Sequence, residues 1–208
     1  RPMWPYKSKI KASGCPNDCV SATARSDIAV IGTWRDDIQV DQAEVAAYAE
    51  LAPNQGYHRP LPNPLHQHDA DKKEITIDNA NCTRCMHCIN VMPKALHVGK
   101  DKGASILLGG KATIVQSAFL GWTVVPFMKL DKENDYENFK DFVERVWDWW
   151  DEHAKTRERL GELIYRLGMN SMLKAIDMKP VPQMVNHPRE NPYIYWYGED
   201  LDNTEVAE

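Results

Sequence analysis

Three cysteines within seven residues are the strongest chemical signal in this chain of 208 residues. Cys82, Cys85 and Cys88 have the spacing C-x2-C-x2-C, which wraps a loop around one iron–sulfur cluster and leaves backbone N–H groups free to bond its sulfides. A zinc site usually takes two separate C-x2-C arms, so a third, evenly spaced cysteine favours iron and sulfur over zinc. Chance clustering of thiols is the alternative, and so dense a group argues against it.

A bacterial ferredoxin run would continue with a fourth cysteine directly before a proline, and that cysteine would serve a second cluster. In this chain the position holds Met92, followed by Pro93. We therefore expect a single cluster in this segment, with a fourth ligand from elsewhere. With three cysteines alone, we expect a labile cluster or a three-iron form.

A second pair, Cys15 and Cys19, has the spacing C-x3-C, which alone is a weak signal. The segment before it carries Lys7, Lys9 and Lys11. In a strand, the period of two puts these ammonium groups on one face, where they repel one another unless an anion lies among them. An exposed edge strand guarded by lysines would show the same pattern. Spacing alone leaves the anion site and the guarded edge equally open.

Composition excludes several classes of function. The net charge of −5 and the pI of about 5.8 argue against a protein that wraps nucleic acid. The longest apolar stretch, around Ala118–Met128, is too short to span a bilayer, and no leader for secretion is visible. Five cysteines in tight groups indicate metal binding in a reducing compartment, so we expect a cytoplasmic protein. Because the chain begins at Arg1, we expect a processed chain or, in preference, a fragment without its N-terminal part.

The elements that must position the cysteines follow from hydrophobic periodicity, and they predict an α+β protein. The first half is expected to contain a strand over Tyr6–Ala12, a cysteine loop over 14–19, a helix over Val20–Arg25 capped by Asp18, a strand over Ile28–Gly32, a helix near Ala43–Leu51 and a proline-rich loop over 53–70. The second half is expected to contain a strand over Glu74–Ile77, a short helix from Pro93, a strand over Ser105–Leu108, two helices within 135–176 and an aromatic tail over Asn191–Tyr197.

Three aromatic residues, Trp147, Trp149 and Trp150, lie at helical spacing near one another. An electron-transfer role is conceivable for such a group. Tryptophans in this pattern more often belong to a core or a subunit interface, and we expect that role here. His87, inside the cysteine loop, is expected to face solvent.

The lysine-rich segment and Ser13–Cys19 together resemble the siroheme–[4Fe-4S] motif of sulfite and nitrite reductases. The details are similar to the alpha subunits of dissimilatory sulfite reductases. The matching stretches are Ala24–Asp27, Ile31–Asp37, Cys82–Pro93, Gly103–Leu107, Val125–Phe127, Trp147–Trp150, Arg157–Gly161 and Asn191–Ile194. The resemblance covers nearly the whole chain except about residues 45–70.

This resemblance implies a partial sulfite-reductase siroheme domain with an inserted ferredoxin-like [4Fe-4S] domain and a C-terminal helical segment. It also implies six-electron reduction of sulfite toward sulfide at siroheme coupled to a [4Fe-4S] cluster, with the insert relaying electrons. The implied divisions are 1–45 for half of the siroheme domain, 46–72 for an aberrant loop, 73–103 for the ferredoxin insert and 104–208 for the remainder.

The resemblance also assigns roles to residues, none of them catalytic. Cys15 and Cys19 match the second of two cysteine pairs that hold the siroheme-coupled cluster, with Cys19 bridging to the siroheme iron. Lys111 matches a position near siroheme, although a surface lysine would fit as well. The residues that match basic side chains binding siroheme carboxylates and sulfite are Lys7, Lys9, Lys11 and Arg25, and this favours the anion site over the guarded edge.

The implied partners are a beta subunit in an alpha2beta2-type assembly, sulfite, and an electron-donor or sulfur-carrier protein. The isolated fragment is expected to be inactive, because half of the ligands of the siroheme-coupled cluster lie outside it. Nitrite reduction by the same cofactor is a further possibility. The alternative from another class is a ferredoxin-like electron-transfer module without its own catalytic haem. A pure electron carrier has no need of an anion pocket, so the lysines separate the two.

One stretch departs from the family. The family carries Cys-Pro-x-x-Cys before the ferredoxin motif, and the first of these cysteines supplies the missing ligand. This chain has Arg59–Gln67 there, without cysteine. Shifted by one base, the codons of that stretch can encode two cysteines, so we hypothesise a reading-frame slip within about residues 49–69. The rival is a true variant in which His66, His68 or an exogenous ligand completes the cluster.

Overall fold

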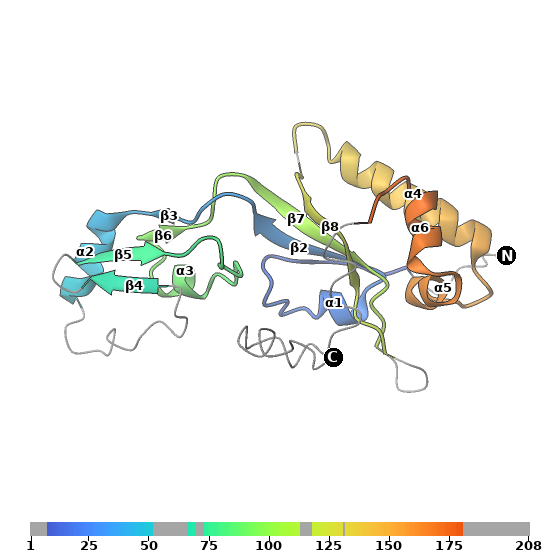
Figure 1. The fold of residues 1–208 in the computed structure, drawn as a ribbon, viewed down its shortest axis with the longest axis horizontal. Coiled ribbons are helices and arrows are strands. Elements are labelled where there is room, and N and C mark those ends of the chain that lie inside the picture. The colour runs from blue at the N-terminus through green and yellow to red at the C-terminus, as the bar shows by residue number, and fades with distance from the viewer. Residues whose placement is uncertain (1–7, 52–65, 70–72, 113–117, 131, 181–208) are drawn as a thin grey trace, which may run out of the picture.

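The computed structural model describes residues 8–51, 66–69, 73–112, 118–130 and 132–180. These residues form an elongated molecule with a larger and a smaller unit, joined by two chain segments that run side by side (Figure 1). The observed architecture is α+β, as predicted. Within the described residues, no helix is long and apolar enough to cross a membrane.

The larger unit is built on a four-stranded sheet in the order β1-β2-β7-β8. Its strands are β1 (Ile10–Ser13), β2 (Ile28–Trp34), β7 (Lys102–Leu108) and β8 (Trp122–Met128). The pair β1–β2 is parallel, because the cysteine loop and the short helix α1 (Ala22–Arg25) make the crossover, and the other pairs are antiparallel. The first cysteine motif therefore lies at the end of an edge strand.

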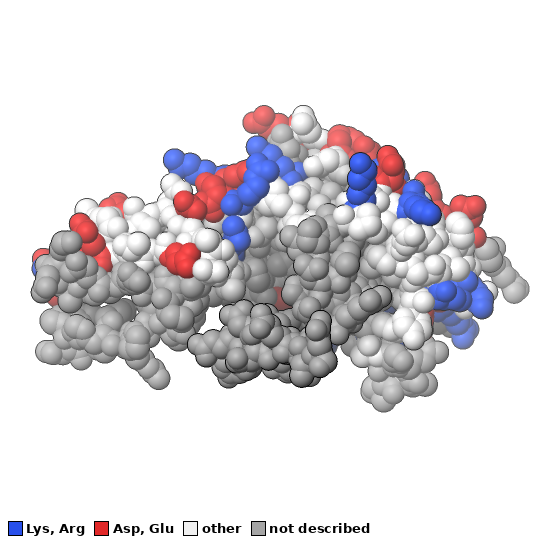
Figure 2. Space-filling view, viewed as in Figure 1, with Lys and Arg blue, Asp and Glu red and all other residues white. Residues whose placement is uncertain are grey.

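Three helices pack with this sheet: α4 (Glu137–His153), α5 (Leu160–Leu167) and α6 (Met169–Ala175) (Figure 1). Apolar residues recur on α4 at three- and four-residue steps, and this stripe is buried against the sheet. Trp149 and Trp150 belong to that core and Trp147 packs half-buried against it, so the expected core role is confirmed. Along α4, Asp and Glu outnumber Lys and Arg, and charged side chains of both signs lie on this edge of the molecule (Figure 2).

The smaller unit contains two two-stranded sheets and two helices. Its elements are β3 (Gln39–Val40), α2 (Gln42–Leu51), β4 (His66–Asp69), β5 (Glu74–Ile77), α3 (His87–Val91) and β6 (Leu96–His97). Its core takes Trp34, Ile38 and Val45 from before the cysteine motif, together with Ile75 and Leu96. Described residues before position 73 therefore pack in the same core as those of the predicted insert of 73–103.

Three predicted elements are corrected. His66–Asp69 was expected to be loop but forms β4, because its backbone pairs with β5 although the sequence shows no apolar period. The short helix α3 ends before Pro93 and does not begin there, since a proline disfavours helical backbone in the residue before it. The helical segment after residue 135 contains three helices, because Gly168 has φ +88° and separates α5 from α6.

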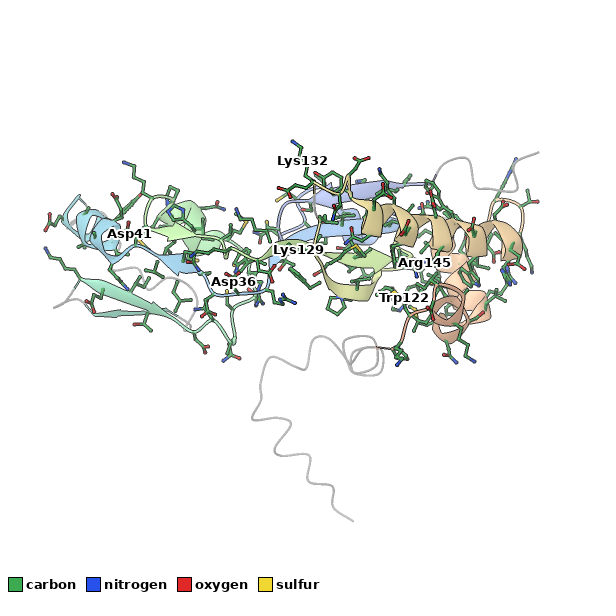
Figure 3. The ribbon with its side chains drawn as sticks, turned by 90° about the horizontal axis from the view of Figure 1, so that it is seen from above. Asp36, Asp41, Trp122, Lys129, Lys132 and Arg145 are labelled. Carbon is green, nitrogen blue, oxygen red and sulfur yellow. The ribbon has the colours of Figure 1, made fainter. Side chains whose placement is uncertain are left out.

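The two connecting segments are bonded to each other, and we call the residues 35, 36 and 99–101 the junction. The backbone N–H groups of Lys100 and Asp101 donate to the Asp36 carboxylate at 2.8 and 3.0 Å. Arg35 forms an ion pair with Asp101 at 2.6 Å. The side chain of Asp36 lies where the two units meet (Figure 3). Burial raises the pKa of Asp36, but these amide donors outweigh it and lower that pKa.

Candidate functional site

The first cysteine motif is a tight turn at the end of β1. The backbone N–H of Asp18 donates to the carbonyl of Cys15 at 3.1 Å, and the Ser13 hydroxyl donates to the same carbonyl at 3.2 Å. Asp18 has φ 46°, in the left-handed region, which bends the chain toward Cys19. Cys15 is partly buried and Cys19 is exposed. The predicted loop is confirmed, and it presents two thiols on the outside of the sheet.

The same turn is fixed to the helix that follows it. The Asp18 carboxylate accepts the backbone N–H groups of Ala22 and Thr23 at 2.7 and 2.8 Å, so it caps α1 as predicted. The helix itself is shorter than the predicted one, Ala22–Arg25. Burial raises the pKa of Asp18, but the two amide donors outweigh it and lower that pKa. The carboxylate between the two cysteines is therefore held in its charged form.

The predicted basic residues lie on both sides of this turn. Lys11 is on β1, and its ammonium donates to the carbonyl of Val20 at 2.9 Å, directly after Cys19. Lys9 precedes β1, and Arg25 is exposed at the end of α1. Lys7 lies outside the described residues. The structure thus brings Lys11 to the cysteine turn.

A buried charge network supports the strand that carries the lysines, and sequence reasoning missed it. Asp27, fully buried, accepts two hydrogen bonds from the Arg159 guanidinium, at 2.7 and 2.8 Å, and a third from the backbone N–H of Lys9 at 2.9 Å. The backbone N–H of Arg159 donates to Glu162, and Glu162 also pairs with Lys111. Lys111 is accordingly buried and ion-paired, which excludes the surface-lysine reading.

The second cysteine motif begins in a loop and ends in α3. Arg84 and Met86 both have left-handed backbone, φ 57° and 63°, which coils the loop around its own side chains. The backbone N–H of Arg84 donates to the sulfur of Cys82 at 3.4 Å, the kind of bond that a thiolate bound to iron accepts. Cys82 and Cys85 are partly buried, Cys88 is buried, and His87 is exposed as expected.

Burial and neighbouring thiols both affect the electrostatics of this loop. Burial raises the pKa of the Cys88 thiol, and the neighbouring Cys82 and Cys85 raise it further. Within the described residues, no three side chains of His, Cys, Asp or Glu converge as the ligands of one metal ion do. The C-x2-C-x2-C spacing fits a cubane cluster, in which each thiolate binds a different iron.

Arg84 links this loop to the junction. Its guanidinium donates to the carbonyl of Cys82 and to the carbonyl of Arg35, both at 3.3 Å. The Nε atom of Arg84 is buried and has no hydrogen-bond partner among the described residues. A buried N–H donor beside Cys82 suits a site that takes a sulfur-rich group, because such a donor otherwise costs free energy.

The two cysteine motifs meet in space. The side-chain amide of Asn17, between Cys15 and Cys19, donates to the carbonyl of Cys85 at 2.6 Å. The two residues are 68 positions apart in sequence. A hydrogen bond therefore links the two motifs, which belong to different units.

Comparisons with known proteins point in one direction. The profile of one family, described as "Nitrite and sulphite reductase 4Fe-4S domain", matches residues 1–183. The chain is 45% identical to "Sulfite reductase, dissimilatory-type subunit alpha" of Nitratidesulfovibrio vulgaris, over 97% of this chain and 49% of the relative. It is 40% identical to the protein of that name from Megalodesulfovibrio gigas, over 81% of this chain and 91% of the relative.

A solved structure agrees. The chain matches "Crystal structure of dissimilatory sulfite reductase I (DsrI)" with a TM-score of 0.76 and 42% identity, over 96% of this chain and 49% of that chain. More distant similarity, at 24% identity, extends to the dissimilatory-type beta subunit of Archaeoglobus fulgidus. The chain spans about half the length of the first two alpha subunits that it matches.

Proposed function

Because the chain belongs to the nitrite and sulphite reductase 4Fe-4S domain family, among the alpha subunits of dissimilatory-type sulfite reductases, we propose that it forms part of a siroheme enzyme that reduces sulfite to sulfide. The single observation that carries the proposal is the position of Lys11. Its ammonium lies at the carbonyl that follows Cys19, so a cation stands beside the cysteine turn. An electron carrier would gain nothing from that cation.

The cysteines supply part of two ligand sets. Cys15 and Cys19 would hold part of a [4Fe-4S] cluster coupled to siroheme, with Cys19 linking the two groups, and Cys82, Cys85 and Cys88 would hold part of the ferredoxin-type cluster. Each [4Fe-4S] cluster takes four ligands, so the five cysteines leave three positions to other residues. Siroheme and its cluster, when bound, supply the iron and the electrons for the reduction.

The residues of the chain supply charge and protons. Sulfite is an anion whose oxygens leave as water, so its reduction needs cations that bind it and donate protons. Lys9, Lys11 and Arg25 take this role, together with Lys7, and they also bind the siroheme carboxylates. The bonds from Arg159 and from the Lys9 backbone to Asp27 hold the start of β1 in register with β2. The network therefore positions the lysines without touching the substrate.

The whole enzyme contains further parts. We propose a beta subunit as the partner, an electron-donor or sulfur-carrier protein as the source of electrons, and the cytoplasm as the location because the cysteines are kept as thiols. We propose that the fourth ligand of the ferredoxin-type cluster comes from within about residues 49–69. In that range His66 and His68 lie on β4, and residues 52–65 lie outside the described part of the chain.

The test uses the full alpha–beta complex. We expect siroheme absorption bands in the purified complex and sulfite-dependent oxidation of a reduced viologen dye. Lys11→Met is expected to keep the bands but to raise the KM for sulfite or lower kcat, since it removes one cation. Lys174→Met, at an exposed position on α6, is the matched control and should leave both unchanged. A wild-type complex that carries clusters but no siroheme would replace this proposal with the electron-carrier alternative.

A further inference from the structure

One side chain touches both cysteine motifs at once. The Nδ2 atom of Asn17 lies 2.6 Å from the carbonyl oxygen of Cys85 and 3.4 Å from the sulfur of Cys15. A primary amide nitrogen carries two N–H groups, so it can donate both hydrogen bonds together. A single nitrogen atom thus joins a ligand residue of the first motif to a ligand residue of the second.

Both ends of this contact are held in place. On the first side, the turn is closed by the bond from the Asp18 N–H to the Cys15 carbonyl, and the Asp18 carboxylate is fixed to α1. On the second side, Cys85 lies between two residues of left-handed backbone. The Arg84 guanidinium also ties that loop to Arg35 in the junction. The hydrogen bond between the two motifs therefore joins two loops whose conformations are both fixed by other contacts.

We propose that Asn17 is the positioning residue that sets the path of electrons between the ferredoxin-type cluster and the siroheme-coupled cluster. The inference rests on the proposed function and adds the residue through which the two motifs communicate. One electron leaves the centre bound by Cys85 and arrives at the centre bound by Cys15, with no bond made or broken and no proton moved. The electrons enter from an external one-electron donor protein.

Two physical effects follow from the Asn17 amide. Its bond to the Cys85 carbonyl holds the two loops together and shortens the gap that the electron must cross. Its bond to the Cys15 sulfur stabilises the more negative, reduced state of the cluster, because hydrogen bonds to cluster sulfurs raise the reduction potential. Replacing the amide by a carboxylate of the same shape removes both donors and sets a negative charge against a carbonyl and a thiolate.

The experiment compares four versions of the full alpha–beta complex under anaerobic conditions: wild type, Asn17→Asp, Asn17→Ala and Asn90→Asp. Asn90 is exposed on α3, two residues after Cys88, so Asn90→Asp adds the same charge near the same motif without touching the contact. Iron and siroheme are counted first. Flash photoreduction then gives the rate at which siroheme is reduced after the ferredoxin-type cluster. EPR during a redox titration gives the midpoint potential of each cluster.

We expect all four complexes to keep their iron and siroheme. Loss of one ordinary hydrogen bond should shift the equilibrium of the electron between the two clusters about fivefold away from the siroheme-coupled cluster, so both Asn17 variants should slow the reduction of siroheme. Their siroheme-coupled cluster should also titrate at a lower potential, whereas Asn90→Asp should match wild type in both measurements.

Other outcomes would overturn the inference. Wild-type rates and potentials in both Asn17 variants would show that electrons do not depend on this contact. Loss of iron from both Asn17 variants, with iron kept in Asn90→Asp, would make Asn17 a structural support only. A wild-type complex without siroheme is a different failure, because it removes the proposed function before any variant is compared.

Discussion

The two units of the molecule have hydrophobic cores of different kinds. In the larger unit, buried aliphatic and aromatic side chains from the sheet and from α4, α5 and α6 make one continuous core. That unit also buries the ion pair between Asp27 and Arg159. In the smaller unit the core is assembled from short elements, and a cysteine of the second motif, Cys88, is one of its buried side chains.

Because the two cores differ, we expect the two proposed clusters to contribute differently to folding. Two-stranded sheets are at best marginally stable alone, and the smaller unit has two of them. One of the proposed cluster ligands, Cys88, is a core residue there, so the binding free energy of a cluster would contribute directly to folding. The larger unit presents Cys15 and Cys19 on its outside and has a complete core without them. We therefore expect the cluster to support the fold in the smaller unit and chiefly the chemistry in the larger one.

The largest expected effect comes from removing a ligand in the smaller unit. Cys85→Ser should remove the ferredoxin-type cluster, because serine oxygen is a poor ligand for iron in such a centre. The iron content should then fall by one cluster. The backbone amides of β5 and α3 should also lose their protection from hydrogen exchange, while those of α4 keep it. Cys88→Ser should unfold the unit further, since that side chain also packs in the core.

The exposed neighbour provides the control. Thr83 lies between two ligands and is exposed, so Thr83→Ala should change neither the iron content nor hydrogen exchange. If β5 and α3 stay protected in Cys85→Ser after the iron is gone, the smaller unit folds without its cluster. The expectation that the cluster supports the fold of the smaller unit, but not that of the larger one, would then be wrong.

The next largest effect is in the larger unit, and it concerns Asp27. Asp27→Asn keeps the shape of the side chain but leaves the Arg159 guanidinium without its anion. Removing one partner of a buried pair typically costs about 3 kcal/mol or more, and urea unfolding of the complex, followed by tryptophan fluorescence, measures it. Lys140→Met, which breaks an exposed ion pair with Asp135 in the same unit, should leave the free energy of unfolding nearly unchanged, because solvent screens such a pair. If both variants lost the same free energy of unfolding, the buried pair of Asp27 and Arg159 would not be a main support of the larger unit.

Local sequence signals predicted most of the regular elements. The expected strand Glu74–Ile77 is β5 residue for residue, because alternation of apolar and polar side chains is a local property. The helix expected near Ala43–Leu51 is α2, Gln42–Leu51. The strand β4 could not be found in this way, since His66–Asp69 has no apolar period and is extended through its pairing with β5.

The site was predictable only in part. Spacing identified the two cysteine motifs, but nothing local shows that Asn17 reaches a carbonyl 68 residues away. The pair of Asp27 and Arg159 is separated by 132 residues and was missed for the same reason. One signal was available: an aspartate directly before a strand that is apolar on both faces must find a buried cation or remain outside the core.

A smaller effect is expected where the start of the cysteine turn lies against β2. A Cβ atom at Gly32 would lie 2.5 Å from the carbonyl oxygen of Gly14, so Gly32→Ala must push the start of the cysteine turn away from the sheet. Such overpacking costs about 2 kcal/mol, less than the loss at Asp27, and thermal unfolding measures it. Gly14→Ala is the matched control, because a Cβ there meets nothing within 4 Å. Equal stability of the two variants would show that the turn is free to move.

The smallest expected effect is a pH dependence, and it again separates the units. In the larger unit, hydrogen bonds from Arg166 lower the pKa of Glu158 from its usual value of 4.5, although burial opposes them. A carboxylate with a lowered pKa stabilises the folded state above its usual value, and this stabilisation is lost as the pH falls below 4.5 through the folded-state pKa. Glu158→Gln should therefore flatten the fall in thermal midpoint over that range.

The counterpart in the smaller unit is Glu50, which pairs with Lys73 on the surface. Lys73 lowers the pKa of Glu50 as well, but both side chains are largely in water, where an ion pair contributes little to stability. Glu50→Gln should therefore leave the acid limb of the thermal midpoint curve unchanged, beside the flattened curve of Glu158→Gln. An equal flattening by both variants would mean that acid destabilises the two units through surface charge alone. The hydrogen bonds from Arg166 to Glu158 would then add nothing to stability.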